Sequence, residues 1–157
     1  MMNIYPWLIV IHILSSTVLF GTGLGTAFQM WLTHRSGNVA SIATVARNVV
    51  IADFLFTAPT VVLQPATGIL LVWWDGIDPL SPWLVTVYFL YLVAGACWLP
   101  VVWLQIKIRD IAVDSAATGR PLPAPYLRYM RLWFILGCPA FTAVMVIFWL
   151  MVNKPNF

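Results

Sequence analysis

Long apolar stretches separated by short polar connections dominate the chain. They cover residues 5–32, 44–74, 82–106 and 132–152. A helix needs about 20 apolar residues to cross the hydrocarbon core of a bilayer, and each stretch is at least that long. Apolar and polar residues do not alternate within the stretches, as they would in membrane-spanning strands. The pattern therefore predicts an all-α integral membrane protein, a four-helix bundle formed by one domain over residues 1–157.

The composition supports the same conclusion. Of the 157 residues, 62% are hydrophobic and 8% are charged, and the chain has nine tryptophans and no glutamate. A soluble domain of this length has too little interior to bury so much apolar surface. The net charge of +3 forms no basic stripe of the kind that binds nucleic acid. We therefore expect a lipid bilayer around the protein, and no nucleic-acid partner.

The charges of the connections predict the orientation. Arg35 lies between the first and second stretches and Arg47 close to the start of the second, and five bases lie between the third and fourth, whereas "DGIDPLSP" at 75–82 has two aspartates and no base. The positive-inside rule places the two basic connections in the cytoplasm and both termini outside it, in a bacterial inner membrane. An interfacial tryptophan belt is predicted from residues near the stretch ends: Trp7, Trp31, Trp73, Trp74, Trp83, Trp103, Trp133 and Trp149.

One histidine, His12, stands inside an apolar stretch, in "LIVIHILSS". A buried imidazole needs a hydrogen-bond partner or a metal. Helical periodicity puts Ser16 and Gly23 on the same face, and Gly23 leaves room there for a flat prosthetic group or for a bulky side chain such as Trp98. His34 follows the stretch, so it cannot share a site with His12. A site with two histidines from one chain is therefore excluded.

The depth of His12 limits its partners. With a rise of 1.5 Å per residue, it lies about 10 Å below the outer end of its helix. Gln64, Tyr88, Tyr91 and Met145 fall at similar depths on the other stretches. The glutamine, the tyrosines or Ser16 could satisfy a structural histidine, whereas Met145 is a possible second axial ligand of haem iron. A ligand role and a purely structural role for His12 both remain open here.

Three further features invite interpretation. Asp53 is the acid expected inside a stretch, and we interpret it as the partner of Arg131, Arg128 or Arg109, with proton handling as the alternative. Gly21 and Gly25 form a G-x-x-x-G seam that packs helices closely, either within the bundle or between two copies of the chain. Cys97 and Cys138 are expected to be small core residues, because two cysteines without further ligands do not make a metal site.

The stretches also resemble a known family. "YPWLIVIHILSSTVLFGTGLGTAFQMW", "FTAPTVVLQPATGILLVWW" and "CWLPVVWLQIKIRDIA" look like bacterial integral membrane proteins of domain-of-unknown-function family 2269. The likeness covers nearly the whole chain, and the third segment is the most specific. This family has no established activity.

A wider likeness points to a cofactor. A tryptophan-leucine pair followed by "IHI" in a first spanning helix resembles the HemJ-type protoporphyrinogen oxidases and the copper-resistance-D-like membrane proteins. In the HemJ-type enzymes that histidine is associated with a b-type haem, and only His12 matches. Their third helix carries an early lysine, but "SPWLVTVYFLYL" has none, which argues against protoporphyrinogen oxidation. The dispersed methionines argue against a copper path.

Two functions follow from these observations. The first is a small membrane protein that binds haem b through His12, which ligates the metal of the haem. The further residues expected to bind the cofactor are Gly23, Gln64, Tyr91 and Met145. It would carry electrons for a membrane oxidoreductase or a quinone. The alternative is a non-catalytic accessory or assembly subunit of a larger membrane complex. The sequence does not decide whether the protein is an enzyme.

Overall fold

The computed structural model describes residues 4–155, which form helices and no strand. The expected all-α fold is confirmed. The elements are α1 (Tyr5–Ser36), α2 (Val39–Ala52), the π-helix η1 (Asp53–Thr57), α3 (Ala58–Trp74), α4 (Pro82–Thr118) and α5 (Ala124–Asn153). Within the described residues, four helices are long and apolar enough to cross a membrane, if α2, η1 and α3 are taken as one.

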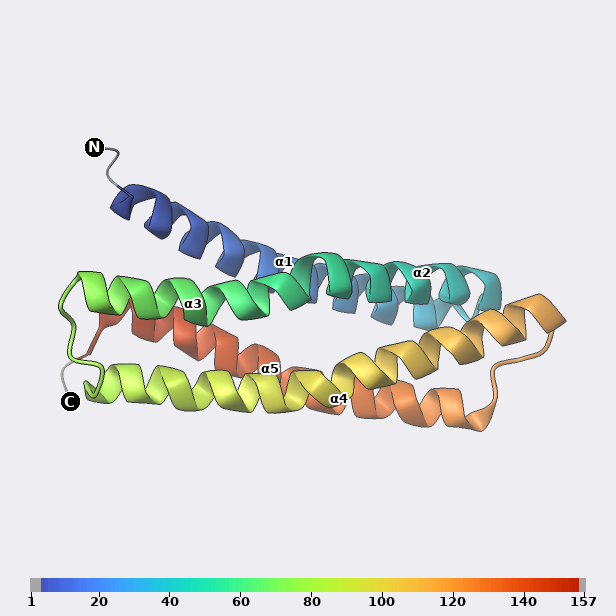
Figure 1. Ribbon diagram of the computed structural model, residues 1–157. Helices are drawn as coiled ribbons and strands as arrows, with labels where there is room; N and C mark the ends of the chain where they lie inside the picture. Colours follow the sequence, from blue (N-terminus) through green and yellow to red (C-terminus); the bar gives the residue numbers. More distant parts are fainter. Residues whose placement is uncertain (1–3, 156–157) are drawn as a thin grey trace.

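The helices run up and down, so that α1 begins and α5 ends at the same end of the bundle (Figure 1). The turns from α1 to α2 and from α4 to α5 lie at the other end. The first of these turns is only two residues long. Gly37 ends α1 with φ of 69°, a conformation that favours glycine, and Asn38 caps α2 by accepting a hydrogen bond from the Ser41 N–H at 3.0 Å.

The second spanning helix is wound differently at its middle. Over Asp53–Thr57 it forms a π-helix, and the Ala58 N–H bonds to the carbonyl of Asp53, five residues back. Pro59 follows at once and has no N–H to donate, which favours a local change of hydrogen-bond register. The π-helix places Asp53 and Thr57, both buried, on the inner side of the helix.

Two apolar clusters hold the bundle together. The larger, near the turn between α1 and α2, is centred on fully buried side chains such as Ile42, Tyr126 and Met130. The smaller, at the opposite end, contains Trp83, Leu84, Val87 and Leu150. His34 Nδ1 and the Tyr126 hydroxyl, 3.1 Å apart, join the end of α1 to the start of α5 beside the larger cluster.

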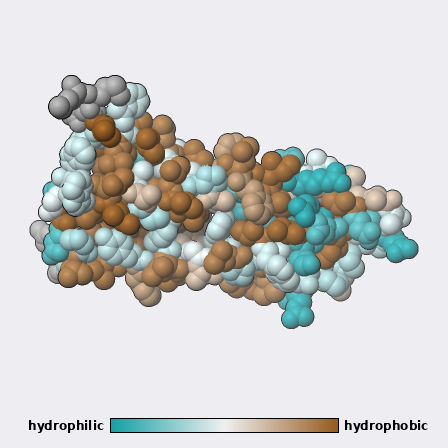
Figure 2. All heavy atoms as spheres, in the orientation of Figure 1, coloured by the Kyte–Doolittle hydropathy of each residue, from teal (hydrophilic) through white to brown (hydrophobic). Residues whose placement is uncertain are grey.

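The surface matches a lipid environment over most of its length. Figure 2 shows hydrophobic residues along the middle of the visible face, while hydrophilic residues gather at the end where α1 turns into α2. α4 is 37 residues long, about 55 Å, and therefore longer than a hydrocarbon core of about 30 Å. Gly119, with φ of 65°, ends α4 inside the long polar connection.

Two details of the expected surface are wrong. Trp83 and Trp133 are 7% and 6% exposed, so they belong to the interior rather than to an interfacial belt. The other six tryptophans of the predicted belt are 39% to 76% exposed. Conversely, Cys138 is exposed and is not a core residue, while Cys97 is partly buried. A cysteine resembles the small residues that pack between helices, so the sequence alone did not distinguish the exposed Cys138 from the partly buried Cys97.

Candidate functional site

His12 is held by side chains from α3. Its Nδ1 atom lies 2.7 Å from the Thr67 hydroxyl oxygen. Gln64 donates from Nε2 to the carbonyl oxygen of His12 at 2.8 Å and to the Ser15 hydroxyl at 2.5 Å. Gln64 and Thr67 are one helical turn apart and face α1 together. The contact therefore fixes both the ring and the backbone of this turn of α1.

A glycine lets the two helices approach at this point. A Cβ atom added to Gly68 would lie 3.4 Å from Cε1 of His12, at the near limit of an ordinary contact. The ring edge that carries Nδ1 and Cε1 thus faces α3. Within residues 4–155, no side chain forms a hydrogen bond with Nε2 of His12.

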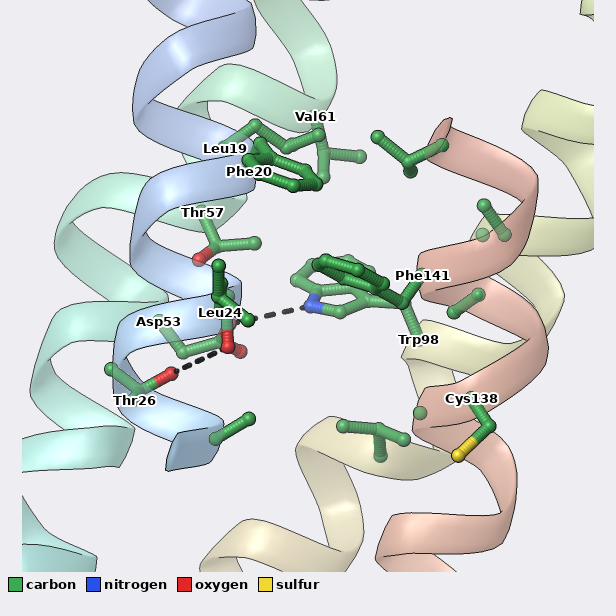
Figure 3. A pocket seen from close by; sticks show the side chains of 18 of the residues that line it. Leu19, Phe20, Leu24, Thr26, Asp53, Thr57, Val61, Trp98, Cys138 and Phe141 are labelled. Atoms are coloured by element: carbon green, nitrogen blue, oxygen red, sulfur yellow. Dashed lines mark hydrogen bonds between the residues drawn. The ribbon is translucent and has the colours of Figure 1, made fainter. Parts of the chain in front are cut away.

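Further along α1, a cavity of about 330 Å³ separates α1, η1 and α3 from α4 and α5 (Figure 3). Its walls are mostly apolar, and they include aromatic side chains from three helices: Phe20, Tyr91, Trp98, Trp133, Phe134 and Phe141. Gly23 and Leu24 of α1 and Cys138 of α5 line the cavity and are themselves exposed. The cavity therefore opens sideways between α1 and α5, toward the bilayer.

Asp53 is the acid of this cavity. The Trp98 indole Nε1 donates to its Oδ1 at 3.4 Å, a long bond that Figure 3 shows between η1 and α4. The expected ion pair with an arginine is wrong. The ion pair within residues 4–155 is Arg109 with Asp110, at 2.8 Å. An indole N–H carries no charge, so counting charged residues could not reveal this partner.

Tyr91 replaces a hydrogen bond that a proline removes from α3. Pro65 lacks an N–H, so the carbonyl of Val61, four residues earlier, loses its helical partner. The Tyr91 hydroxyl donates to this carbonyl oxygen at 2.5 Å. Such repair by a neighbouring helix is the way a proline is tolerated inside a membrane helix.

The predicted site residues thus fall into separate places. His12 and Gln64 are in contact, whereas Gly23 and Tyr91 line the cavity and His12 does not. Gly23 lies about 16 Å further along α1 than His12. Met145, on α5, is 48% exposed. The residue that sequence reasoning missed is Thr67, because its hydroxyl also bonds to its own helix and only the packing of α3 against α1 brings it to His12.

The structure adds no metal cluster. Within the described residues, no group of three or more His, Cys, Asp or Glu side chains could hold a metal ion. The G-x-x-x-G seam is open, because a Cβ added at Gly21 or Gly25 would meet no atom within 4 Å. This seam faces outward, so any close packing on it comes from outside the chain.

Comparison with known proteins places the chain in a family. Residues 6–155 match the family model described as "Predicted integral membrane protein (DUF2269)", so the chain belongs to this family. No curated protein and no solved structure matches the chain.

Proposed function

We propose that this member of the DUF2269 family binds a b-type haem through Nε2 of His12 and serves electron transfer in the membrane. The observation that carries the proposal is the pairing of Nδ1 of His12 with Thr67 at 2.7 Å, which leaves Nε2 without a hydrogen bond from residues 4–155. A histidine that ligates a metal commonly binds through one ring nitrogen while the other is held by a second group.

The hydrogen bonds around Thr67 assign the tautomer. The Thr67 hydroxyl donates to the carbonyl oxygen of Leu63 at 2.6 Å, so its oxygen is left to accept. We therefore assign the ring proton to Nδ1, which makes Nε2 the nitrogen with a free lone pair. Such a neutral imidazole fits an iron ligand. Gln64 donates to the backbone carbonyl of His12 and thereby helps to hold the imidazole ring beside Thr67.

Haem, when bound, would supply one-electron chemistry. The chain would position it through His12 and exclude water with the apolar side chains of α1 and α3 beside that histidine. Met145 stays a prediction as a second residue that would hold the haem iron, and Tyr91 is a weaker candidate because its hydroxyl already donates to the Val61 carbonyl. A membrane oxidoreductase or a quinone is the partner that this role requires.

The test compares two histidines. The protein is produced in haem-replete cells, purified, and examined for a Soret band. Wild-type protein should show the band, His12→Ala should lose it, and His34→Ala, which alters a histidine at the other end of α1, should keep it. A colourless wild-type protein after haem supplementation would overturn the proposal, as would an unchanged spectrum of His12→Ala.

We also propose that the protein lies in the bacterial inner membrane with the basic end of the bundle in the cytoplasm. The α1–α2 and α4–α5 turns lie together at one end of the bundle, as Figure 1 shows, and most of the bases lie in the helix segments beside these turns. The positive-inside rule assigns this end to the cytoplasm. The exposed Gly21 and Gly25 support a second proposal, that two copies of the chain associate through α1.

A further inference from the structure

Asp53 stands in the cavity without a charged partner. It is 8% exposed, and among the described residues that line the cavity none is Lys, Arg or His. The donor that reaches its carboxyl group is the Trp98 indole, at 3.4 Å. Thr57 lies close to the carboxyl group, but its hydroxyl forms no hydrogen bond of normal geometry with residues 4–155. A carboxylate at this depth is costly unless a cation compensates it.

The walls around Asp53 suit a particular kind of cation. Aromatic side chains from α1, α4 and α5 line the cavity, among them Phe20, Trp98 and Phe141, and the faces of such rings attract cations. Phe20 and Phe141 stack with ring centroids 4.8 Å apart, which joins the walls formed by α1 and α5. The rest of the lining is largely apolar and does not replace the water shell of a small inorganic ion.

The size of the cavity and the position of its opening further limit which ligands can bind. The cavity volume of about 330 Å³ lies at the lower end of the range for small-molecule sites, roughly 300 to 1,000 Å³. Its exposed margin, with Gly23, Leu24 and Cys138, opens toward lipid. A ligand with an apolar body can enter there from the bilayer.

We propose that Asp53 and the aromatic cavity around it bind a lipophilic organic cation, such as an aryl ammonium compound with a single ring. The carboxylate balances the charge, the aromatic walls contact the ring and the ammonium methyl groups, and Trp98 holds the carboxylate toward the cavity. This site goes beyond haem binding and does not depend on it, because His12 is not part of the cavity wall.

The experiment uses two probes of nearly the same shape. Phenyltrimethylammonium carries a charge, and tert-butylbenzene is its neutral counterpart. Binding of each to the purified full chain in detergent is measured by calorimetry, with the probes first equilibrated with micelles. Wild-type protein should bind the cation more tightly than the neutral probe. Asp53→Asn should weaken binding of the cation by about tenfold or more and leave the neutral probe unaffected. Asparagine keeps an acceptor for Trp98, and Asp110→Asn, with the same change of charge outside the cavity, should bind like the wild type.

A second pair of variants tests the place of binding. Gly23→Leu puts a side chain at the mouth of the cavity, where an added Cβ meets no atom within 4 Å. Thr17→Leu puts the same side chain at an exposed position of α1 that does not line the cavity. Gly23→Leu should abolish binding of the cation, whereas Thr17→Leu should retain it. This pair decides the question even if Asp53→Asn fails to fold. The proposal is overturned if the wild type binds no cation, if the neutral probe binds equally well, or if both leucine variants bind alike.

Discussion

His12 Nδ1 lies 2.7 Å from the hydroxyl oxygen of Thr67, and that hydroxyl in turn donates to the carbonyl of Leu63 at 2.6 Å. The chain of two bonds runs from a ring on α1 to the backbone of α3. It gives the imidazole a fixed orientation and one proton position with uncharged groups alone. Because the Thr67 hydroxyl fixes the proton on Nδ1, it also affects how well Nε2 binds a metal, although Thr67 does not contact Nε2.

Thr67 is therefore expected to tune haem affinity. Thr67→Val keeps the shape of the side chain but removes the acceptor for Nδ1, and loss of such a supporting partner typically weakens metal binding by about 10- to 100-fold. Thr67→Ser retains the hydroxyl and should behave like the wild type. The rate at which haem transfers to an excess of an apo haem protein measures the difference. Equal rates for the valine and serine variants would show that Thr67 does not support the ligand.

The Tyr91 hydroxyl should contribute to the stability of the protein only because Pro65 leaves the Val61 carbonyl without a helical partner. Tyr91→Phe leaves the Val61 carbonyl without a partner and should lower the free energy of unfolding by about 1 kcal/mol. In a Pro65→Ala background, the new alanine N–H can bond to Val61, so the same change should cost much less. Thermal unfolding in detergent of the four proteins in this cycle tests the coupling.

Tyr88→Phe serves as the matched control for that cycle. The Tyr88 side chain is 40% exposed and forms no side-chain hydrogen bond with residues 4–155, so its loss should change stability little. If Tyr91→Phe costs the same with and without Pro65, the hydroxyl does not replace the missing helical bond.

Much of the fold could be predicted because a membrane helix is specified by a long apolar stretch, which the sequence displays directly. The contact of Gln64 with His12 could be anticipated from depth alone. Thr67 could not, since a threonine inside a helix usually bonds to its own backbone, and only packing shows that its oxygen also accepts from another helix. Trp98 escaped notice as the partner of Asp53 for a similar reason, because an uncharged indole leaves no electrostatic pattern along the chain.

Neutralising the arginines that the sequence suggests as partners of Asp53 should change the stability of the protein little. Arg128 and Arg131 are exposed and form no ion pair within the described part of the chain. Arg128→Gln and Arg131→Gln should each change the free energy of unfolding by less than about 0.5 kcal/mol. Trp98→Phe removes the donor to Asp53 and part of the cavity wall, so a loss of about 1 kcal/mol or more is expected. Thermal unfolding in detergent compares the three variants, and a larger loss for Arg131→Gln than for Trp98→Phe would restore the ion-pair interpretation.

The orientation of the bundle can be tested with two single cysteines. Leu80 is 77% exposed in the connection between α3 and α4, and Thr118 is exposed at the end of α4, so the two lie at opposite ends of the bundle. Each is changed to cysteine after Cys97→Ala and Cys138→Ala. A membrane-impermeant maleimide should label Leu80→Cys in spheroplasts and label Thr118→Cys only after the membrane is disrupted, because the basic connections are retained in the cytoplasm. The opposite labelling pattern would place these bases outside the cell and reverse the proposed orientation, while leaving the helical packing unchanged.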